Sequence, residues 1–172
     1  MFRRMQLNIM PTPPTTPEAQ ALITELNFTL KLKTGRDGSA NFTHEDVETP
    51  RSTFLIAYKD KTPLGCGALR PLDETTCEIK RMYARIKRLG IGHKILKALE
   101  QKAIGLGYRQ VFLETGIQNH ETIQFYLTRG YKIRDNYGKY ANRPECLCFE
   151  KTLVPDPSIF TLLPVTQSSK IG

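Results

Sequence analysis

The sequence predicts an α+β protein in which a mixed sheet is flanked by helices. Three short apolar runs, separated by pairs of turn residues, follow one another between residues 53 and 83. A long amphipathic helix comes next, and after it a buried strand, a second helix and a last strand. Hairpin strands followed by alternating helices and strands indicate a sheet with helices on its faces.

The N-terminal third is predicted to contain one strand and one long helix. Phe2–Met10 alternates loosely enough to form a strand, and a proline-rich linker follows it. Thr15 or Thr16 can cap a helix that begins at Pro17, because proline is favoured at the first helical position. A single helical turn is predicted over His44–Glu48. The long helix is expected to bury an apolar stripe made of Ala21, Leu22, Leu26 and Leu30.

The remaining elements follow from alternation, helical periodicity and glycine or acidic turn residues. Strands are predicted over Thr53–Tyr58, Leu64–Leu69, Cys77–Tyr83, Gln110–Thr115 and Glu145–Leu153, with hairpin turns at Asp60–Lys61 and Asp73–Glu74. Helices are predicted over Gly90–Leu106 and Asn119–Thr128.

Length and composition bound the kind of protein. The chain has 172 residues, close to the usual size of one domain, so we expect a single domain over residues 1–153 and a tail over 154–172 that can be disordered. No run of 18 apolar residues exists, which argues against a membrane span. The four cysteines have no zinc-ligand spacing, so we expect no metal and free thiols in the cytoplasm.

The excess positive charge is concentrated in one stretch of the chain. Of the net charge of +8, residues 78–110 carry +7, from nine basic and two acidic side chains. Such a local field attracts a compact polyanion as readily as a duplex. No groove-reading motif accompanies it, so we expect no nucleic-acid partner. For Lys97 and Lys102 an exposed, solvated helix face is the simpler interpretation.

Residues 87–92, with the sequence Lys-Arg-Leu-Gly-Ile-Gly, lie between a predicted strand and a predicted helix. A turn of this kind exposes unpaired backbone N–H groups at the positive end of a helix, which suits a pyrophosphate. Gly90 and Gly92 would let the backbone approach such a ligand closely. An ordinary helix start is the alternative. A dinucleotide motif is disfavoured because its third glycine is missing at Ile95.

Together with its neighbours, this segment resembles the GNAT family of acetyl-CoA-dependent N-acetyltransferases. The family's phosphate motif is Q/R-x-x-G-x-G/A, and here Lys87 stands in its first position. Residues 119–131 resemble the family's pattern N-x-x-A-x-x-x-Y-x-x-x-G-F/Y, with Thr122 in place of alanine. The resemblance covers residues 50–153 and implies a GNAT-like fold with a mostly antiparallel central sheet.

The resemblance implies acetyl-CoA as co-substrate and names the residues that would hold it. The backbone of Met82, Tyr83 and Ala84 would bind the pantetheine arm, and a backbone N–H there could polarise the thioester. Asn119 would contact coenzyme A near the sulfur, or simply cap a helix. The segment around the pyrophosphate would comprise Arg88, Leu89, Gly90, Ile91, Gly92, His93 and Lys94.

Acetyl transfer to an amine needs an acid for the departing thiolate and a base for the attacking ammonium. Tyr126 is the candidate acid, with a core tyrosine as the alternative. Glu78 is the candidate base, and an ion pair with Lys80 or Arg81 is an equally good account. Strand alternation would place Glu78, Lys80 and Met82 on one face. Glu114 is the runner-up base or a substrate contact.

The loop before the last strand supplies the weak candidates for the acceptor pocket, which are Tyr137, Tyr140 and Arg143. The favoured function is direct transfer of acetyl from acetyl-CoA to a primary amine of a small molecule or a protein. The alternative is a non-catalytic sensor or regulatory module that binds acetyl-CoA with the same fold. A homodimer is possible, since members of the family often dimerise.

Overall fold

A computed structural model describes residues 6–154 of the chain. Seven strands form one sheet in the order β1-β2-β3-β4-β5-β7-β6. Every neighbouring pair is antiparallel except β4 and β5, which are parallel. The strands are β1 (Asn8–Pro11), β2 (Thr53–Lys59), β3 (Thr62–Pro71), β4 (Thr76–Ala84), β5 (Gln110–Gly116), β6 (Lys132–Arg134) and β7 (Cys146–Thr152). The helices are α1 (Pro17–Thr34), α2 (Ile91–Gly105) and α3 (His120–Leu127), with short 3-10 turns at Ser39–Asn41, His44–Val47 and Gly138–Tyr140.

Helix α1 begins and ends where local chemistry dictates. The Thr16 side chain accepts a hydrogen bond from the Ala19 N–H, and Pro17 occupies the first helical position. At the other end Gly35 adopts a left-handed conformation, which satisfies a final carbonyl. The buried face contains Ala19, Leu22 and Leu26, so the prediction that Ala21 belongs to this stripe is wrong.

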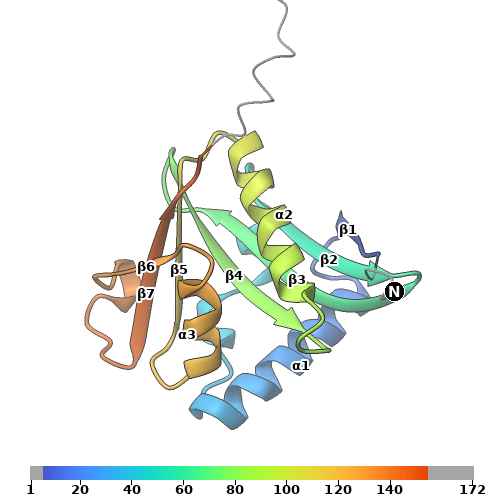
Figure 1. Ribbon diagram of the computed structural model, residues 1–172, viewed down its shortest axis with the longest axis horizontal. Helices are drawn as coiled ribbons and strands as arrows, with labels where there is room; N and C mark the ends of the chain where they lie inside the picture. Colours follow the sequence, from blue (N-terminus) through green and yellow to red (C-terminus); the bar gives the residue numbers. More distant parts are fainter. Residues whose placement is uncertain (1–5, 155–172) are drawn as a thin grey trace, which may run out of the picture.

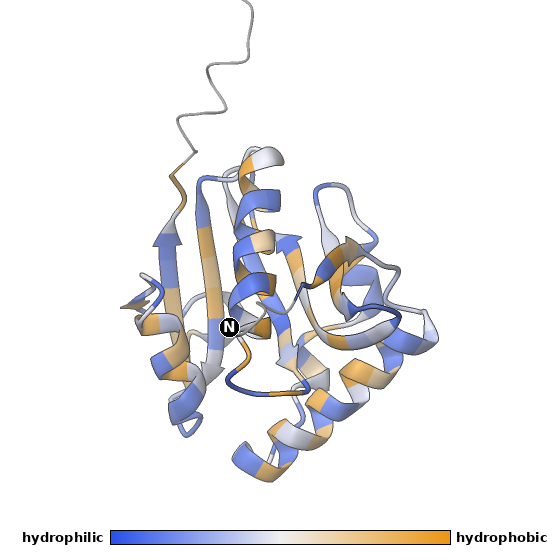
Figure 2. Cartoon of the chain, turned by 45° about the vertical axis from the view of Figure 1, so that its right-hand side comes forward, coloured by the Kyte–Doolittle hydropathy of each residue, from blue (hydrophilic) through white to orange (hydrophobic). Residues whose placement is uncertain are grey.

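Helix α2 packs closely on the opposite face of the sheet, which is possible because β3 carries glycines beneath it. A Cβ on Gly67 would lie 2.8 Å from Leu99 Cδ1 and 2.9 Å from Ile95 Cγ2. The buried residues of α2 are Ile91, Ile95, Leu96, Leu99 and Ala103, and Figure 2 shows the matching bands of hydrophobic and hydrophilic residues along the helices. The sheet is therefore covered by α1 on one side and by α2 and α3 on the other.

Strands β4 and β5 pair over only three residues each, Thr76–Glu78 with Gln110–Phe112. Beyond that point they spread apart, and α3 lies near the opening (Figure 1). The edge of β4 that faces β5 is thus unpaired with β5 over residues 79–84. An opening between two parallel strands exposes backbone donors and acceptors, which makes it a natural place for a ligand.

A β-bulge in β4 changes which side chains share a face. Arg81 has φ of +56°, and the pairing of β4 with β3 shifts register there. The prediction that Met82 lies on the same face as Glu78 and Lys80 is wrong, because the bulge reverses the alternation. Met82 packs with Ile79 into the core beneath α2, whereas Glu78 and Lys80 meet on the other face.

Most elements lie where the sequence predicts them, with small shifts at their ends. The three-residue strand β6 was not predicted, because a strand of that length gives no alternation to detect. The first strand is shorter than predicted, and its residues 2–5 lie outside the described residues, as does nearly all of the predicted tail. Over residues 6–154, no helix is long and apolar enough to cross a membrane.

Candidate functional site

A groove of about 250 Å³ lies between the end of β4, the first turn of α2 and helix α3, and we call it the α2 groove. Eight of the eleven predicted cofactor residues line it: Met82, Tyr83, Ala84, Arg88, Gly90, Ile91, Gly92 and His93. Lys87, from the first position of the phosphate motif, also lines it. The other lining residues, which the sequence did not indicate as cofactor contacts, are Lys33, Ile86, Glu121, Thr122, Phe125, Tyr126 and Arg129. Glu121, Thr122, Phe125, Tyr126 and Arg129 lie within the motif over residues 119–131, so the sequence did carry a signal for them.

The floor of the α2 groove is the N-terminus of α2. Gly90 caps the helix in a left-handed conformation with φ of +73°, and no side chain makes a capping hydrogen bond. The first N–H groups of a helix have no acceptor within it, so they are available here to an anion. A Cβ on Gly92 would lie 3.5 Å from the Phe125 ring, so this position faces α3.

Positive side chains surround that helix end. The Arg129 guanidinium lies 3.8 Å above the Phe125 ring and donates to His93 Nδ1 at 3.3 Å. On the other side of the groove, Lys87 forms a 2.5 Å ion pair with Glu121. The hydrogen bond with Lys87 is the largest cause that lowers the pKa of Glu121. This charge pattern suits a ligand with several phosphate groups.

Glu121 joins three elements across the mouth of the groove. Besides Lys87 from the loop before α2, it pairs with Lys33 from α1 at 3.4 Å. The two ion pairs therefore hold the negative charge of Glu121 among the positively charged side chains that line the α2 groove.

Three predicted cofactor residues lie elsewhere. Leu89 is an exposed side chain and Lys94 lies one turn into α2, and neither lines the groove. Asn119 stands at the N-cap of α3 without a side-chain capping bond, and it lines the neighbouring cavity instead.

That neighbour is the central cavity, of about 110 Å³, which lies between the spreading strands β4 and β5. Tyr126 lines both the α2 groove and the central cavity. Its ring packs against Phe125, Tyr131 and Phe149 at 5.2–5.9 Å between centroids. Within residues 6–154 its hydroxyl has no hydrogen-bond partner, and burial, followed by the charge of Glu114, raises the pKa of Tyr126.

Glu78 is 1% exposed and lies in a closed network of polar side chains. Its Oε1 accepts from Arg70 Nε at 2.9 Å and lies 3.6 Å from Lys80 Nζ. Its Oε2 accepts a hydrogen bond from the Tyr137 hydroxyl. Arg70 also contacts Asp46 at 2.6 Å. The arrangement favours the ion-pair account of Glu78, with Arg70, directly across the β3–β4 pair, as the main partner.

The predicted acceptor residues Tyr137 and Tyr140 belong to this same network. Tyr140 is 1% exposed and its hydroxyl accepts from Lys80 Nζ at 2.5 Å. Burial lowers the pKa of Lys80, and burial together with the nearby Glu78 carboxylate raises the pKa of Tyr137. Neither tyrosine lines the α2 groove or the central cavity. They support the loop before β7 from within.

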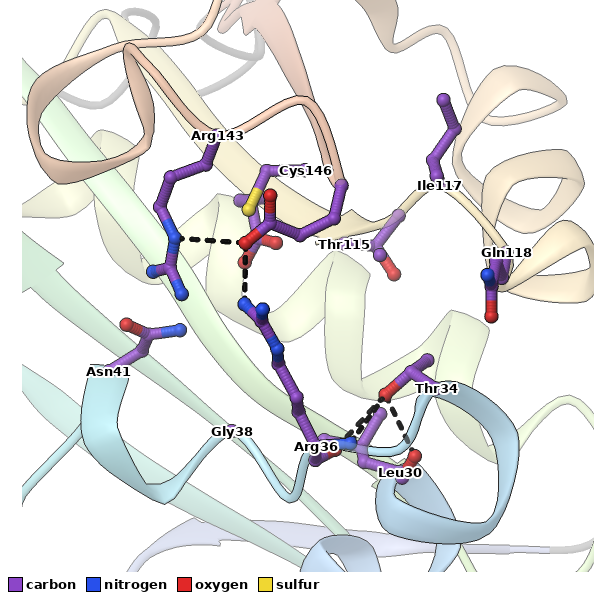
Figure 3. Close-up of a pocket in the computed structure, with 13 residues that line it drawn as sticks. Leu30, Thr34, Arg36, Gly38, Asn41, Thr115, Ile117, Gln118, Arg143 and Cys146 are labelled. Carbon is purple, nitrogen blue, oxygen red and sulfur yellow. Dashed lines mark hydrogen bonds and ion pairs between the residues drawn. The ribbon is translucent and has the colours of Figure 1, made fainter.

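Glu114 and Arg143 do line a third cavity, of about 280 Å³, which we call the outer cavity. It lies between the end of α1, the end of β5 and the start of β7, and Figure 3 shows its lining residues. Glu114 lines both the central and the outer cavity. The three hollows therefore form a row, with Tyr126 between the first two and Glu114 between the last two.

The basic stretch of residues 78–110 does not form one continuous surface. Lys80 and Arg81 are largely buried in the sheet, and Arg85 is engaged by Glu25 at 2.6 Å. Only part of the stretch, at Lys87 and Arg88, faces the α2 groove. Lys97 and Lys102 are exposed on α2, as the sequence indicated.

Among residues 6–154, no group of three or more His, Cys, Asp or Glu side chains could hold a metal ion. All four cysteines are buried and unpaired. Burial, with the charge of Glu114, raises the pKa of Cys146 to about 12, so this thiol stays protonated near neutral pH.

Comparisons with known proteins agree with this architecture. The family model "Acetyltransferase (GNAT) family" matches residues 20–131. An "IAA acetyltransferase" of Azospirillum brasilense is 34% identical over 114 residues, which is 63% of this chain and 74% of the relative. The crystal structure of a putative acyl-CoA N-acyltransferase of Klebsiella pneumoniae is 28% identical, with a TM-score of 0.72 over 87% of this chain and 99% of the other.

A GNAT family acetyltransferase of Elizabethkingia anophelis, solved with acetyl-CoA bound, has the same fold, with a TM-score of 0.64 and 22% identity over 86% of this chain and 98% of the other. The family match spans more than half of the sequence and agrees with the order of strands and helices in the structure. The chain therefore belongs to the GNAT family of acetyltransferases.

Proposed function

We propose that the protein transfers the acetyl group of acetyl-CoA to the primary amine of a small acceptor, by direct attack while both substrates are bound. The observation that carries this proposal is the row of three hollows, joined at Tyr126 and at Glu114. A thioester bound beside Tyr126 and an amine that enters past Glu114 would meet in the central cavity. Holding two reactants in contact accounts for a large part of such a rate enhancement.

The α2 groove would hold acetyl-CoA. The uncapped first turn of α2 would donate backbone N–H groups to the pyrophosphate, and Arg88 would add charge. The edge of β4 that β5 leaves free, at residues 82–84, would form strand-like hydrogen bonds with the amides of the pantetheine arm. A backbone N–H at the Arg81 bulge, where the regular pairing of β4 with β3 is interrupted, would polarise the thioester carbonyl.

Tyr126 would be the general acid. When the neutral amine nitrogen bonds to the carbonyl carbon and the carbon–sulfur bond breaks, the sulfur leaves as a thiolate. The nitrogen, now part of an amide, would lose its second proton, and this proton would restore the Tyr126 hydroxyl after Tyr126 has protonated the sulfur. Tyr126 borders both hollows, and its hydroxyl has no hydrogen-bond partner among the described residues, so it would be free to donate its proton. The raised pKa of Tyr126 keeps the hydroxyl protonated at neutral pH, which an acid requires.

Glu114 would be the base, rather than Glu78. Both oxygens of Glu78 are engaged by buried donors, so they are poorly placed to accept a proton from a substrate. Glu114 borders the central cavity from the acceptor side. It would take the proton that the ammonium loses, directly or through water. Glu78 would instead hold Arg70 and Tyr137 in place behind the site.

The test is release of free coenzyme A from acetyl-CoA in the presence of a panel of primary amines. We expect release that depends on both the amine and the enzyme. The non-catalytic sensor makes the opposite prediction, because acetyl-CoA would then bind with micromolar or better affinity while no amine accelerates thiol release. Calorimetric titration of acetyl-CoA, run beside the assay, separates a protein that does not bind the co-substrate from one that binds it without turnover.

A further inference from the structure

Two arginines converge on one carboxylate at the outer cavity. Arg36 Nη1 lies 2.5 Å from Glu145 Oε1, and Arg143 Nε lies 3.2 Å from the same oxygen (Figure 3). Arg36 comes from the loop after α1, whereas Arg143 comes from the loop before β7. Because one carboxylate faces two guanidinium groups, the cluster has a net charge of +1 and spare N–H donors.

The backbone on both sides of the cluster is fixed by hydrogen bonds. The Arg36 N–H donates to Thr34 Oγ1 at 3.4 Å, and buried Arg81 donates to the carbonyl of Gly38 in the same loop. On the other side, Asn136 Nδ2 donates to the carbonyl of Arg143 at 3.0 Å. A pair of cations held on well-fixed loops can bind an anion with little further ordering.

The rest of the outer cavity has the opposite charge. Glu114 lines it where it meets the central cavity, and Thr115 and Gly116 continue that wall along β5. A ligand in this cavity therefore faces a carboxylate toward the reaction centre and a net positive cluster toward the outside. This polarity is complementary to a molecule with an ammonium group at one end and an anionic group at the other.

We propose that the acetyl acceptor is a small amine that carries a carboxylate, of which a free amino acid is the simplest case. This inference rests on the proposed function and adds the substrate class. Arg36 and Arg143 would bind the acceptor carboxylate while Glu114 receives its ammonium group. A carboxylate fits the pair because the carboxylate of Glu145 already occupies it. The cavity of about 280 Å³ suits a small acceptor.

Glu145 would act as an internal competitor for the acceptor. Its side chain is 40% exposed, and those of Arg36 and Arg143 are 63% and 34% exposed, so the cluster is accessible from solvent. An incoming carboxylate would take over one or both guanidinium groups from Glu145. Removing the charge of Glu145 should therefore strengthen the binding of the acceptor, a direction that loss of structure would not produce.

The first arm of the test compares matched acceptors at saturating acetyl-CoA. Each amino acid is assayed beside its amide and its decarboxylated amine, with aminoalkyl phosphonates as a further set. We expect kcat/KM for the acids to exceed that for the amides by about 10- to 100-fold, the effect of one charge-assisted contact. A difference in basicity would not produce this order. The amino group of the amide is less basic than that of the acid, so a larger fraction of it is neutral and reactive at a given pH.

The second arm uses variants with the same matched pairs. Arg143→Gln and Arg36→Gln should each lower kcat/KM for the acids about 10-fold or more and leave the amides within about 3-fold. Glu145→Gln should lower KM for the acids. Arg109→Gln, an exposed arginine outside the cavity, is the control and should change neither.

The outcomes separate this inference from the proposed function. Equal or better acetylation of amides and simple amines would overturn the substrate class and leave acetyl transfer intact. Preference for the phosphonates would overturn the assignment to a carboxylate. If no amine is acetylated, the proposed function fails, and thermal shift with coenzyme A plus each matched pair still tests recognition. Stabilisation by the acids alone, lost in Arg143→Gln, supports the carboxylate site, and equal shifts within each pair contradict it.

Discussion

Burial raises the pKa of the Tyr126 hydroxyl, and the carboxylate of Glu114, which borders the same cavity, raises it further. Tyr126 comes from α3 and lines both the central cavity and the α2 groove. Glu114 comes from β5 and lines both the central cavity and the outer cavity. In the proposed mechanism Tyr126 would be the protonated acid on the side of the thiol and Glu114 the carboxylate on the side of the amine.

The first prediction concerns the hydroxyl of Tyr126. In Tyr126→Phe the ring contacts with Phe125, Tyr131 and Phe149 are kept, and no described residue loses a hydrogen-bond partner. We therefore expect nearly unchanged melting and acetyl-CoA affinity but a kcat lower by about 10²–10⁴.

Tyr131→Phe is the matched control for Tyr126→Phe. The Tyr131 hydroxyl donates to Glu100 at 2.9 Å and does not line the three cavities. Its loss should cost about 1.5 kcal/mol of stability and little turnover. If both variants lose stability and keep their rate, Tyr126 is a core residue and the proposed acid is wrong.

The second prediction separates the two candidate bases. Glu114→Gln should lower kcat/KM for the amine strongly at pH 7. The loss should shrink as the pH rises toward the pKa of the amine, about 10.4 for an alkyl ammonium, because a growing share of the acceptor is then already neutral. A pH profile of kcat/KM from 6 to 10, at saturating acetyl-CoA, measures this.

Glu78→Gln should behave differently, because Glu78 is the buried partner of Arg70. Breaking a buried ion pair leaves an uncompensated charge, so we expect a loss of about 3 kcal/mol in unfolding by urea. The rate per folded molecule should fall without the alkaline recovery seen for Glu114→Gln. The reverse pattern, with alkaline recovery in Glu78→Gln alone, would return the role of base to Glu78.

The third prediction concerns the ion pairs of Glu121 with Lys33 and Lys87. Glu121→Gln removes a negative charge from the mouth of the α2 groove and releases two cations toward the phosphates. We expect acetyl-CoA to bind several-fold more tightly, with a larger effect at low salt. Glu74→Gln, an exposed change outside the groove, should leave the dissociation constant unchanged. Weaker binding in Glu121→Gln would mean that Glu121 itself holds the ligand.

The fourth prediction tests the N-terminus of α2 as the phosphate site. Gly90 has φ of +73°, and a Cβ there would meet nothing within 4 Å. Asparagine and aspartate both tolerate this conformation and have nearly the same shape, so Gly90→Asn and Gly90→Asp differ mainly in charge. We expect Gly90→Asp to weaken acetyl-CoA binding at least about 10-fold more than Gly90→Asn. Equal affinities, measured by calorimetry, would place the phosphates elsewhere.

Much of the fold can be predicted from local sequence signals. The hairpin strands and α2 are visible because turn residues and apolar periodicity are encoded within a few positions, and Gly90 marks the start of α2. The bulge at Arg81 is not visible, because it depends on pairing with β3. The same limit explains the wrong face predicted for Met82.

The candidate site could be predicted only in part. Gly90, Gly92 and Tyr126 lie in motifs, so their place beside one groove follows from the resemblance. The engagement of Glu78 by Tyr137, 59 residues later in the chain, depends on tertiary packing and left no signal. Arg36 belongs to a loop that matched no motif. Only the structure shows that Arg36 and Arg143 line the same cavity.

In the proposed mechanism acetyl moves directly between two bound substrates, with no acetylated enzyme. A covalent route would need a nucleophile beside the site, and the raised pKa of Cys146, about 12, makes that thiol a poor one. The most direct test measures initial rates while the concentrations of acetyl-CoA and the amine are both varied. Direct transfer predicts double-reciprocal lines that intersect, because both substrates must be bound together. Parallel lines, accompanied by acetylated protein when acetyl-CoA is added alone, would contradict it.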